Sequence, residues 1–234
     1  MTGKIKLVHS GGNAVSIAVP TSNPSSSEVE FKLPGSDGSA NQVLKTDGSG
    51  NLSFASETAD FVKLASVQDS TGGTVSNFTF DSLDTSTYQA FKLIMNMTPT
   101  DESSVELRFR WRVSGTDQTS DEYNWTNLGV SGGGSYFDNA DEETFGLFSF
   151  SAGDKTGEGY RMIDATIIPK TSSDFNQSRN SYYVMAQRYD SSASHRGETN
   201  FGTYNVSVNP DGFIIYAASG SFKNYGYTLY GLKR

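Results

Sequence analysis

The sequence predicts an all-β protein with an extended, β-prone N-terminal arm over residues 1–58 and an antiparallel, jelly-roll-like β-sandwich over residues 59–234. Three observations support this. Short apolar runs recur along the chain and are separated by turns rich in Gly, Asn, Asp and Ser. No segment keeps a helical apolar period over ten or more residues. The chain contains 15 Phe, 12 Tyr and 2 Trp, enough large side chains to fill a core between two sheets.

The arm consists of short extended pieces with little apolar material. Residues 4–8 and 14–19 are β-like runs on either side of a Gly-rich turn, which predicts a hairpin or two consecutive extended pieces. Residues 28–33 alternate apolar and polar side chains, which predicts another extended piece. Isolated strands of this kind are unstable in water and need partner strands. We therefore expect the arm to become ordered on another surface.

Residues 33–54, LPGSDGSANQVLKTDGSGNLSF, are the most distinctive part of the arm. Pro-Gly and Asp-Gly pairs predict tight turns, because Gly accepts positive φ and Asp caps its own backbone. The turns separate two small apolar pieces, one holding Val43 and Leu44 and the other Leu52 and Phe54. We predict that these four side chains are attachment contacts, buried against something other than their own domain.

After residue 60 the pattern is that of a sandwich with eight to ten strands. The expected strands cover residues 61–67, 74–80, 88–97, 104–113, 144–151, 160–169, 181–190, 200–208, 212–218 and 225–232. Residues 121–139 are expected to form an irregular, Gly-rich crossover between strands.

The strand expected over residues 104–113 has the most regular alternation in the chain. Its apolar side chains would lie on one face, and Arg108, Arg110 and Arg112 on the other. The arginine face has two interpretations. It is either a solvated outer face paired with carboxylates of a neighbouring strand, or a subunit interface in which arginines meet carboxylates of another copy.

Aromatic side chains in the expected crossover are candidates for stacking on sugar rings. These are Tyr123, Trp125 and Tyr136, with packing beneath the loop as the alternative. No catalytic site is expected. Ser131 lies in a G-x-S-x-G pattern, but the strand and helix which that motif requires are not predicted around it.

Composition narrows the classes of partner. The formal net charge is −8, which disfavours nucleic acid because phosphate binding needs a basic face. No apolar run is long enough to cross a bilayer, so membrane insertion is not expected. The chain has no Cys and only two His, His9 and His195, so we expect no metal site and no cofactor.

The segment 33–56 resembles a string, roughly LP-x-x-DGS-x-x-QVL-x-TDGSG-x-LSF, found in tail fibres and other virion surface proteins of tailed bacteriophages, especially marine and cyanobacterial ones. The closing Tyr227–Lys233 segment, YTLYGLK, is similar to the final strand of phage surface β-domains. The resemblance implies a structural protein of the virion surface, made in the host cytoplasm, commonly a homotrimer, whose arm docks on other virion proteins or intertwines with sister chains.

Long fibres repeat such segments or add shaft domains, whereas this chain has one copy of the segment and one distal domain. This favours a short tail fibre or appendage, or a capsid decoration protein, over a complete long fibre. The chain is expected not to be an enzyme. A different class of function also stays open: a carbohydrate-binding module that recognises a host cell-surface glycan through Trp125 and its neighbouring tyrosines.

Overall fold

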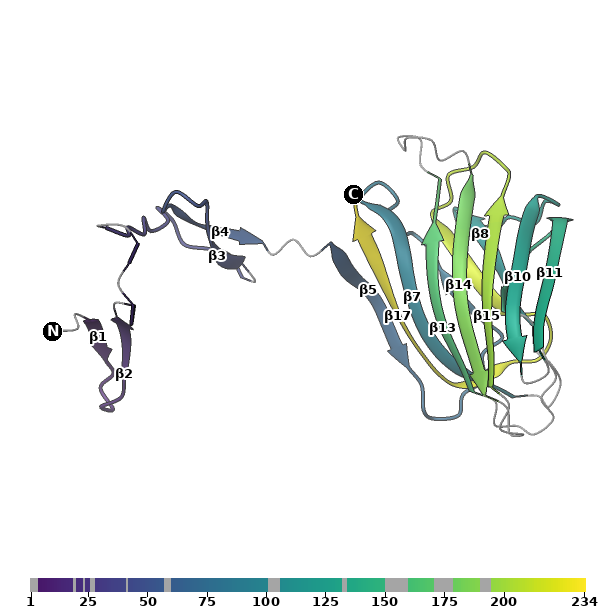
Figure 1. Cartoon of the computed structure of the whole chain (residues 1–234), viewed down its shortest axis with the longest axis horizontal. Helices are drawn as coiled ribbons and strands as arrows, with labels where there is room; N and C mark the ends of the chain where they lie inside the picture. The colour runs from purple at the N-terminus through teal and green to yellow at the C-terminus, as the bar shows by residue number, and fades with distance from the viewer. Residues whose placement is uncertain are drawn as a thin grey trace. The chain divides into compact units, whose positions relative to one another are not determined.

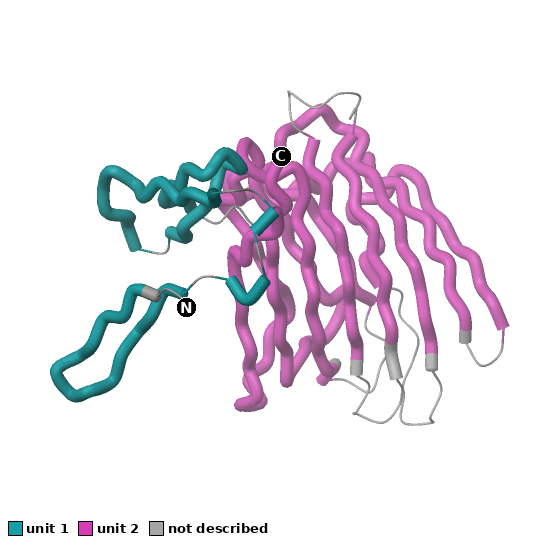
Figure 2. Tube along the Cα trace, turned by 60° about the vertical axis from the view of Figure 1, so that its left-hand side comes forward, with its two compact units in different colours: residues 1–58 teal, residues 59–234 magenta. Residues whose placement is uncertain are grey.

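The computed structural model describes residues 4–18, 20–22, 24–25, 28–40, 42–56, 60–100, 106–131, 134–149, 160–170, 179–189 and 195–234. The chain divides into two compact units, residues 1–58 and residues 59–234 (Figure 2). Every regular element of the described residues is a β-strand. None of them contains a helix long and apolar enough to span a membrane.

The first unit contains two separate hairpins. Strands β1 (Lys4–Val8) and β2 (Ala14–Ala18) pair antiparallel around the expected Gly-rich turn, and β3 (Gln42–Thr46) pairs with β4 (Leu52–Ser56). Residues 28–33 do not form the extended strand that their alternation suggested. They make a single parallel bridge, in which Lys32 N donates to Gly50 O and Leu52 N donates to Lys32 O, each at 2.8 Å.

The second unit is built on an eight-stranded antiparallel sheet, seen across its face in Figure 1. Its strands, in order across the sheet, are β11 (Gly134–Glu143), β10 (Tyr123–Ser131), β15 (His195–Tyr204), β14 (Asn180–Tyr189), β13 (Tyr160–Ile168), β7 (Tyr88–Pro99), β17 (Phe222–Lys233) and β5 (Phe61–Gln68).

A smaller, five-stranded antiparallel sheet packs on one face of the large one. Its strands are β12 (Gly146–Ser149), β8 (Leu107–Val113), β16 (Gly212–Ala217) and β6 (Asn77–Phe80), with β9 (Thr116–Asp117) paired to β8. The predicted all-β sandwich is therefore confirmed.

The core between the sheets is aromatic. Phe109 of β8 lies at its centre, with ring centroids 5.8 Å from Phe148, 5.7 Å from Phe213 and 4.7 Å from Tyr182 of the large sheet. The alternation expected for β8 is present, since Leu107, Phe109 and Trp111 are buried in this core. The arginines between them therefore lie on the outer face of the small sheet.

The chain passes repeatedly from one sheet to the other. It goes from β5 to β6, β7 and β8 with a change of sheet at every step, and it changes sheet again around β12 and around β16. Such crossing is typical of jelly-roll-like sandwiches. The run β13, β14, β15 instead stays within one sheet as neighbouring antiparallel strands, which makes the large sheet wider than the small one.

The expectation of an irregular crossover over residues 121–139 was wrong. Residues 123–131 and 134–139 belong to the hairpin of β10 and β11, which pairs from Tyr123–Glu143 to Ser131–Gly134, and residues 132 and 133 lie outside the described residues. Strand β10 also pairs along its length with β15, so the hairpin forms one margin of the large sheet (Figure 1).

Candidate functional site

The hairpin of β3 and β4 places the four predicted attachment residues. Leu44 and Phe54 are directly opposite each other, and Leu52 lies two residues from Phe54 on the same face. Val43 is on the other face, opposite Ala55. Val43, Leu44 and Phe54 are 42, 51 and 40% exposed. The structure therefore brings Leu44, Leu52 and Phe54 together and leaves Leu44 and Phe54 exposed, with Leu52 partly buried. The burial of the four side chains against a partner stays a prediction.

The turn of this hairpin is held by Asp47. Its Oδ1 accepts from the backbone N of Ser49 at 2.8 Å and of Asn51 at 3.1 Å, and its Oδ2 accepts from Asn51 Nδ2 at 2.6 Å. These hydrogen bonds hold the pKa of Asp47 below its usual value. Gly50 has φ of +89°, and a Cβ there would come 2.7 Å from Glu30 O. The glycines thus let residue 30 pass close to the turn and fix the geometry of the hairpin.

The hairpin of β1 and β2 also has an uncovered apolar face. Ile5 is opposite Ile17 and Leu7 is opposite Val15, so the four side chains share one face. Each of them is more than half exposed. A two-stranded hairpin with one bare apolar face is marginally stable alone in water, so a covering surface would add to its stability.

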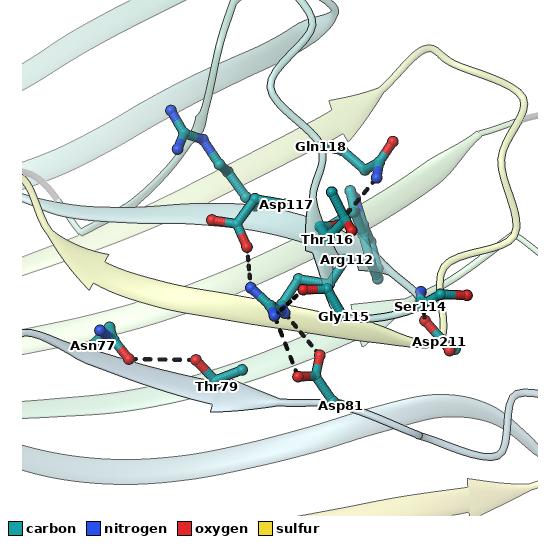
Figure 3. Close-up of polar contacts among 12 residues, drawn as sticks. Asn77, Thr79, Asp81, Arg112, Ser114, Gly115, Thr116, Asp117, Gln118 and Asp211 are labelled. Carbon is teal, nitrogen blue, oxygen red and sulfur yellow. Dashed lines mark hydrogen bonds and ion pairs between the residues drawn. The ribbon is translucent and has the colours of Figure 1, made fainter.

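On the outer face of the small sheet, Arg112 is the centre of an ion-pair cluster (Figure 3). Its guanidinium pairs with Asp81, with Nε 2.7 Å from Oδ1, and with Asp117; it also donates to Gly115 O. The Arg112 side chain is only 14% exposed. The hydrogen bond that Arg112 donates to Asp81 raises the pKa of Arg112 above its usual value.

The other two arginines of β8 are also engaged within the chain. Arg108 Nε lies 2.5 Å from Glu106 Oε1, and its guanidinium carbon lies 3.8 Å from the centre of the Phe145 ring. Arg110 Nε donates to Thr144 O at 2.9 Å, and its guanidinium carbon lies 5.0 Å from the centre of the Tyr216 ring. These contacts lie within the chain, but of the three arginines it is Arg112 that pairs with a carboxylate beside a neighbouring strand, as the outer-face interpretation describes. The subunit interface stays a prediction for this face.

Tyr123 is a core residue, so its assignment as a sugar contact was wrong. Its side chain is fully buried, its hydroxyl accepts from Trp111 N at 2.9 Å and donates to Gln118 O at 3.0 Å. Burial raises the pKa of Tyr123. A ring enclosed in this way joins the two sheets and leaves no face on which a sugar could stack.

Tyr136 is half-buried and covers the backbone of the facing strand. Its ring occupies the space of a side chain on Gly129, its partner in β10. Its hydroxyl donates to Glu198 Oε2 at 3.4 Å. Trp125 is also half-buried, and its indole N–H is enclosed without a hydrogen-bond partner among the described residues. Both residues pack against the sheet more than they extend from it.

Two groups of side chains were not singled out from the sequence. The first is a buried polar cluster, in which Asn127 Nδ2 donates to Asn200 Oδ1 at 2.6 Å and Ser149 donates to Glu198. The second is the pair Tyr183 and Phe201 on the outer face of the large sheet, with ring centroids 5.1 Å apart. In the structure, burial alternates along residues 181–187, with Tyr182 and Val184 buried. The sequence of that segment, SYYVMAQ, shows no alternation of apolar and polar side chains, so it did not mark Tyr183 as outward-facing, and the buried polar cluster had no local signal either.

In the described part of the chain, no three His, Cys, Asp or Glu side chains are grouped so that they could hold a metal ion. Ser131 is the last residue of β10, where it pairs with Gly134 across the hairpin. It therefore ends a strand that leads into a hairpin, which is not the strand-to-helix turn of a nucleophile elbow.

No family model matches the chain, and no curated protein matches it. Among solved structures, the comparison found the crystal structure of the infectious bursal disease virus VP2 subviral particle, with 11% sequence identity and a TM-score of 0.15. The alignment covers 94% of this chain and 51% of that chain, so this chain spans about half the length of its neighbour. A likeness at this TM-score carries no argument about fold or function.

Proposed function

We propose that the chain is a non-enzymatic structural protein of a bacteriophage virion, a homotrimeric short tail fibre or appendage. Residues 1–58 attach it to other virion proteins or to sister chains, and the β-sandwich is exposed on the virion surface. The resemblance of residues 33–56 to virion surface proteins supports this. A capsid decoration protein is the alternative position on the same kind of particle.

The observation that carries the proposal is the uncovered apolar surface of the first unit. Both hairpins present paired apolar side chains, Ile5 with Ile17 and Leu44 with Phe54, that are 40% or more exposed. Burial of such side chains contributes about 25 cal/mol per Å² of apolar surface removed from water. An arm of this kind gains most of its order from what it binds, as an attachment segment does.

The second unit supports the proposal in a different way. It has an extensive aromatic core of its own, and the arginines of its small sheet have partners within the chain. A unit with these properties does not depend on the arm for its interior packing. It suits a domain that is held away from its point of attachment.

The test is deletion of residues 1–56 from the chain in the genome that encodes it, followed by analysis of purified virions. We expect the truncated protein to be made and folded, with the far-ultraviolet circular dichroism of a β-protein, but to be absent from virions. Light scattering on the purified full-length protein is expected to give the mass of a trimer.

A full-length monomer together with undiminished incorporation of the truncated chain would overturn the proposal. The copy number per virion separates the two positions. A number comparable to that of the capsid subunits means a decoration protein, whereas a small multiple of three means a tail appendage.

A further inference from the structure

A shallow hollow of about 430 Å³ lies on the large sheet, lined mainly by outward-facing side chains of β10, β11, β14 and β15. It lies on the face opposite the small sheet, because the residues that alternate with its outward-facing ones point into the core. Its volume is within the range of small-ligand sites. The four strands are adjacent in the sheet (Figure 1), so the floor of the hollow is continuous hydrogen-bonded backbone.

The floor carries the aromatic pair Tyr183 and Phe201. The two residues are directly opposite each other on β14 and β15, with ring centroids 5.1 Å apart and planes at 54°. Phe201 is 43% exposed, although its neighbours in sequence, Asn200 and Gly202, are buried. A tilted pair of rings open to solvent offers two apolar surfaces on which a flat, partly apolar molecule can stack.

Polar side chains surround this pair. Ser181 and Thr203 face each other one row further along β14 and β15, and Asn139 and Asp141 come from β11. In the described residues, none of these four side chains has a hydrogen-bond or ion-pair partner. The hollow thus combines apolar ring faces with unoccupied donors and acceptors: hydroxyls, an amide and a carboxylate.

The arginine face of the small sheet is different in this respect. There the two rings beside the arginines are covered, because the Arg108 guanidinium lies over Phe145 and the Arg110 guanidinium over Tyr216. Of the two outer faces, the large sheet therefore has the aromatic pair that is open to a ligand beside polar side chains. Trp125 lies in the strand beneath the hollow, but it alternates with Asn124 and Thr126, so its side chain is on the inward face of the sheet.

We propose that this hollow binds a neutral saccharide, with one pyranose ring stacked on Phe201 and Tyr183 and its hydroxyls bonded by Asn139, Asp141 and Thr203. A sugar has the matching chemistry, an apolar C–H face and a rim of hydroxyls that both donate and accept. A neutral sugar fits better than an anionic one, because Asp141 lies in the hollow and the chain has a net charge of −8. The inference deepens the proposed function. It rests on that function for the biological setting, whereas the binding chemistry rests on the hollow itself.

The experiment uses the full-length chain on a printed array of neutral and anionic oligosaccharides, followed by calorimetry with the neutral oligosaccharide that gives the strongest signal. The test variant is Tyr183→Ala with Phe201→Ala, and the control is Ile94→Ala. Ile94 is an exposed apolar residue on the same face of the sheet, outside the hollow. We expect the double variant to lose at least tenfold in affinity and the control to stay within twofold of wild type.

A second variant keeps the test valid if the double variant does not fold. Asn139→Ala with Asp141→Ala changes only exposed side chains of β11, and at least a fivefold loss is expected. The proposal is overturned if the wild-type chain binds no neutral saccharide at millimolar concentration, if it binds only anionic ones, or if either folded double variant binds as wild type does. Saccharide binding by a chain that is absent from virions would overturn the proposed function and leave this inference standing.

Discussion

The ring of Tyr182 fills the space in which a side chain on Gly202 would lie. A Cβ on Gly202, in the neighbouring strand β15, would overlap the ring. The same ring lies against Gly146 of β12 in the small sheet, where a Cβ would be 2.7 Å from ring carbon Cε1. The Tyr182 hydroxyl donates to Leu147 O at 2.9 Å. Two glycines, one in each sheet, thus let a buried tyrosine connect the two layers.

Gly202→Ala is therefore expected to destabilise the sandwich by about 1–3 kcal/mol, the usual cost of forcing additional volume into a packed interior. The control is Gly197→Ala in the same strand, because the nearest atom to a Cβ there is Val130 Cγ2 at 3.8 Å. That change should stay within about 0.5 kcal/mol of wild type. Urea unfolding followed by circular dichroism measures both, and equal midpoints for the two variants would contradict the role given to Gly202.

The regular strands could be predicted from alternation, whereas the β10–β11 hairpin could not. In β10, the inward face includes Asn127 and Gly129, and the outward face includes Leu128 and Val130. Neither face is uniformly apolar. The Asn127 amide nitrogen donates to Asn200 across the strand pair, although its buried oxygen has no hydrogen-bond partner among the described residues, and the space at Gly129 is filled by Tyr136. Asn200 is 73 residues from Asn127, so no local pattern could show that pairing, and Tyr136 meets Gly129 only once the register of the hairpin is set.

The same limit applies to the candidate sites. Alternation in residues 107–113 correctly placed the three arginines on the face away from the core, but their partners depend on how the strands are ordered. Asp81 follows β6 and is 31 residues from Arg112. In the arm, turn chemistry correctly predicted the position of the Asp47 turn, since its hydrogen bonds lie within four residues.

Arg112→Ala is expected to lower the free energy of unfolding by about 1–3 kcal/mol. The change removes charge-assisted hydrogen bonds to Asp81 and Asp117 and leaves both carboxylates partly buried without their cation. Arg108→Ala is the matched control in the same strand. Arg108 is more exposed, its ion pair in the described part of the chain is with nearby Glu106, and its other contact is the Phe145 ring, so its loss should cost less than about 1 kcal/mol. Denaturant unfolding of both variants measures the free energy of unfolding that each one loses. A larger loss for Arg108→Ala than for Arg112→Ala would contradict the prediction.

The turn between β6 and β7 should contribute to the acid sensitivity of the fold. Asp84 Oδ1 accepts from Ser86 Oγ at 2.5 Å and from the backbone N of Ser86 and Thr87, and these bonds lower the pKa of Asp84 to about 2. A lowered folded-state pKa stabilises the fold above the usual value of 3.8. This contribution is lost as the pH falls through 2.

Asp84→Asn should therefore have a lower melting temperature than wild type at pH 7, and the difference should shrink between pH 4 and pH 2. The control is Asp121→Asn, because the Asp121 side chain accepts no hydrogen bond from the residues that the structure describes. Thermal unfolding over this pH series provides the measurement. A difference between Asp84→Asn and wild type that stays constant from pH 7 to pH 2 would exclude a contribution from the charged carboxylate.

The apolar face of the β3–β4 hairpin should matter for attachment and not for the fold of the sandwich. Leu44→Ser with Phe54→Ser removes the exposed apolar pair, while Lys45→Ser changes the opposite face of the same hairpin. Because these residues belong to the first unit, both variants should leave the free energy of unfolding of the sandwich, measured with urea, within about 0.5 kcal/mol of wild type. Virion incorporation should fall at least tenfold for the double variant, since one lost apolar contact of about 1.4 kcal/mol already changes an equilibrium constant tenfold.

Lys45→Ser should be incorporated as wild type is. Equal incorporation of both variants would mean that the arm binds through other side chains, of which the Ile5–Ile17 face of the first hairpin is the next to change.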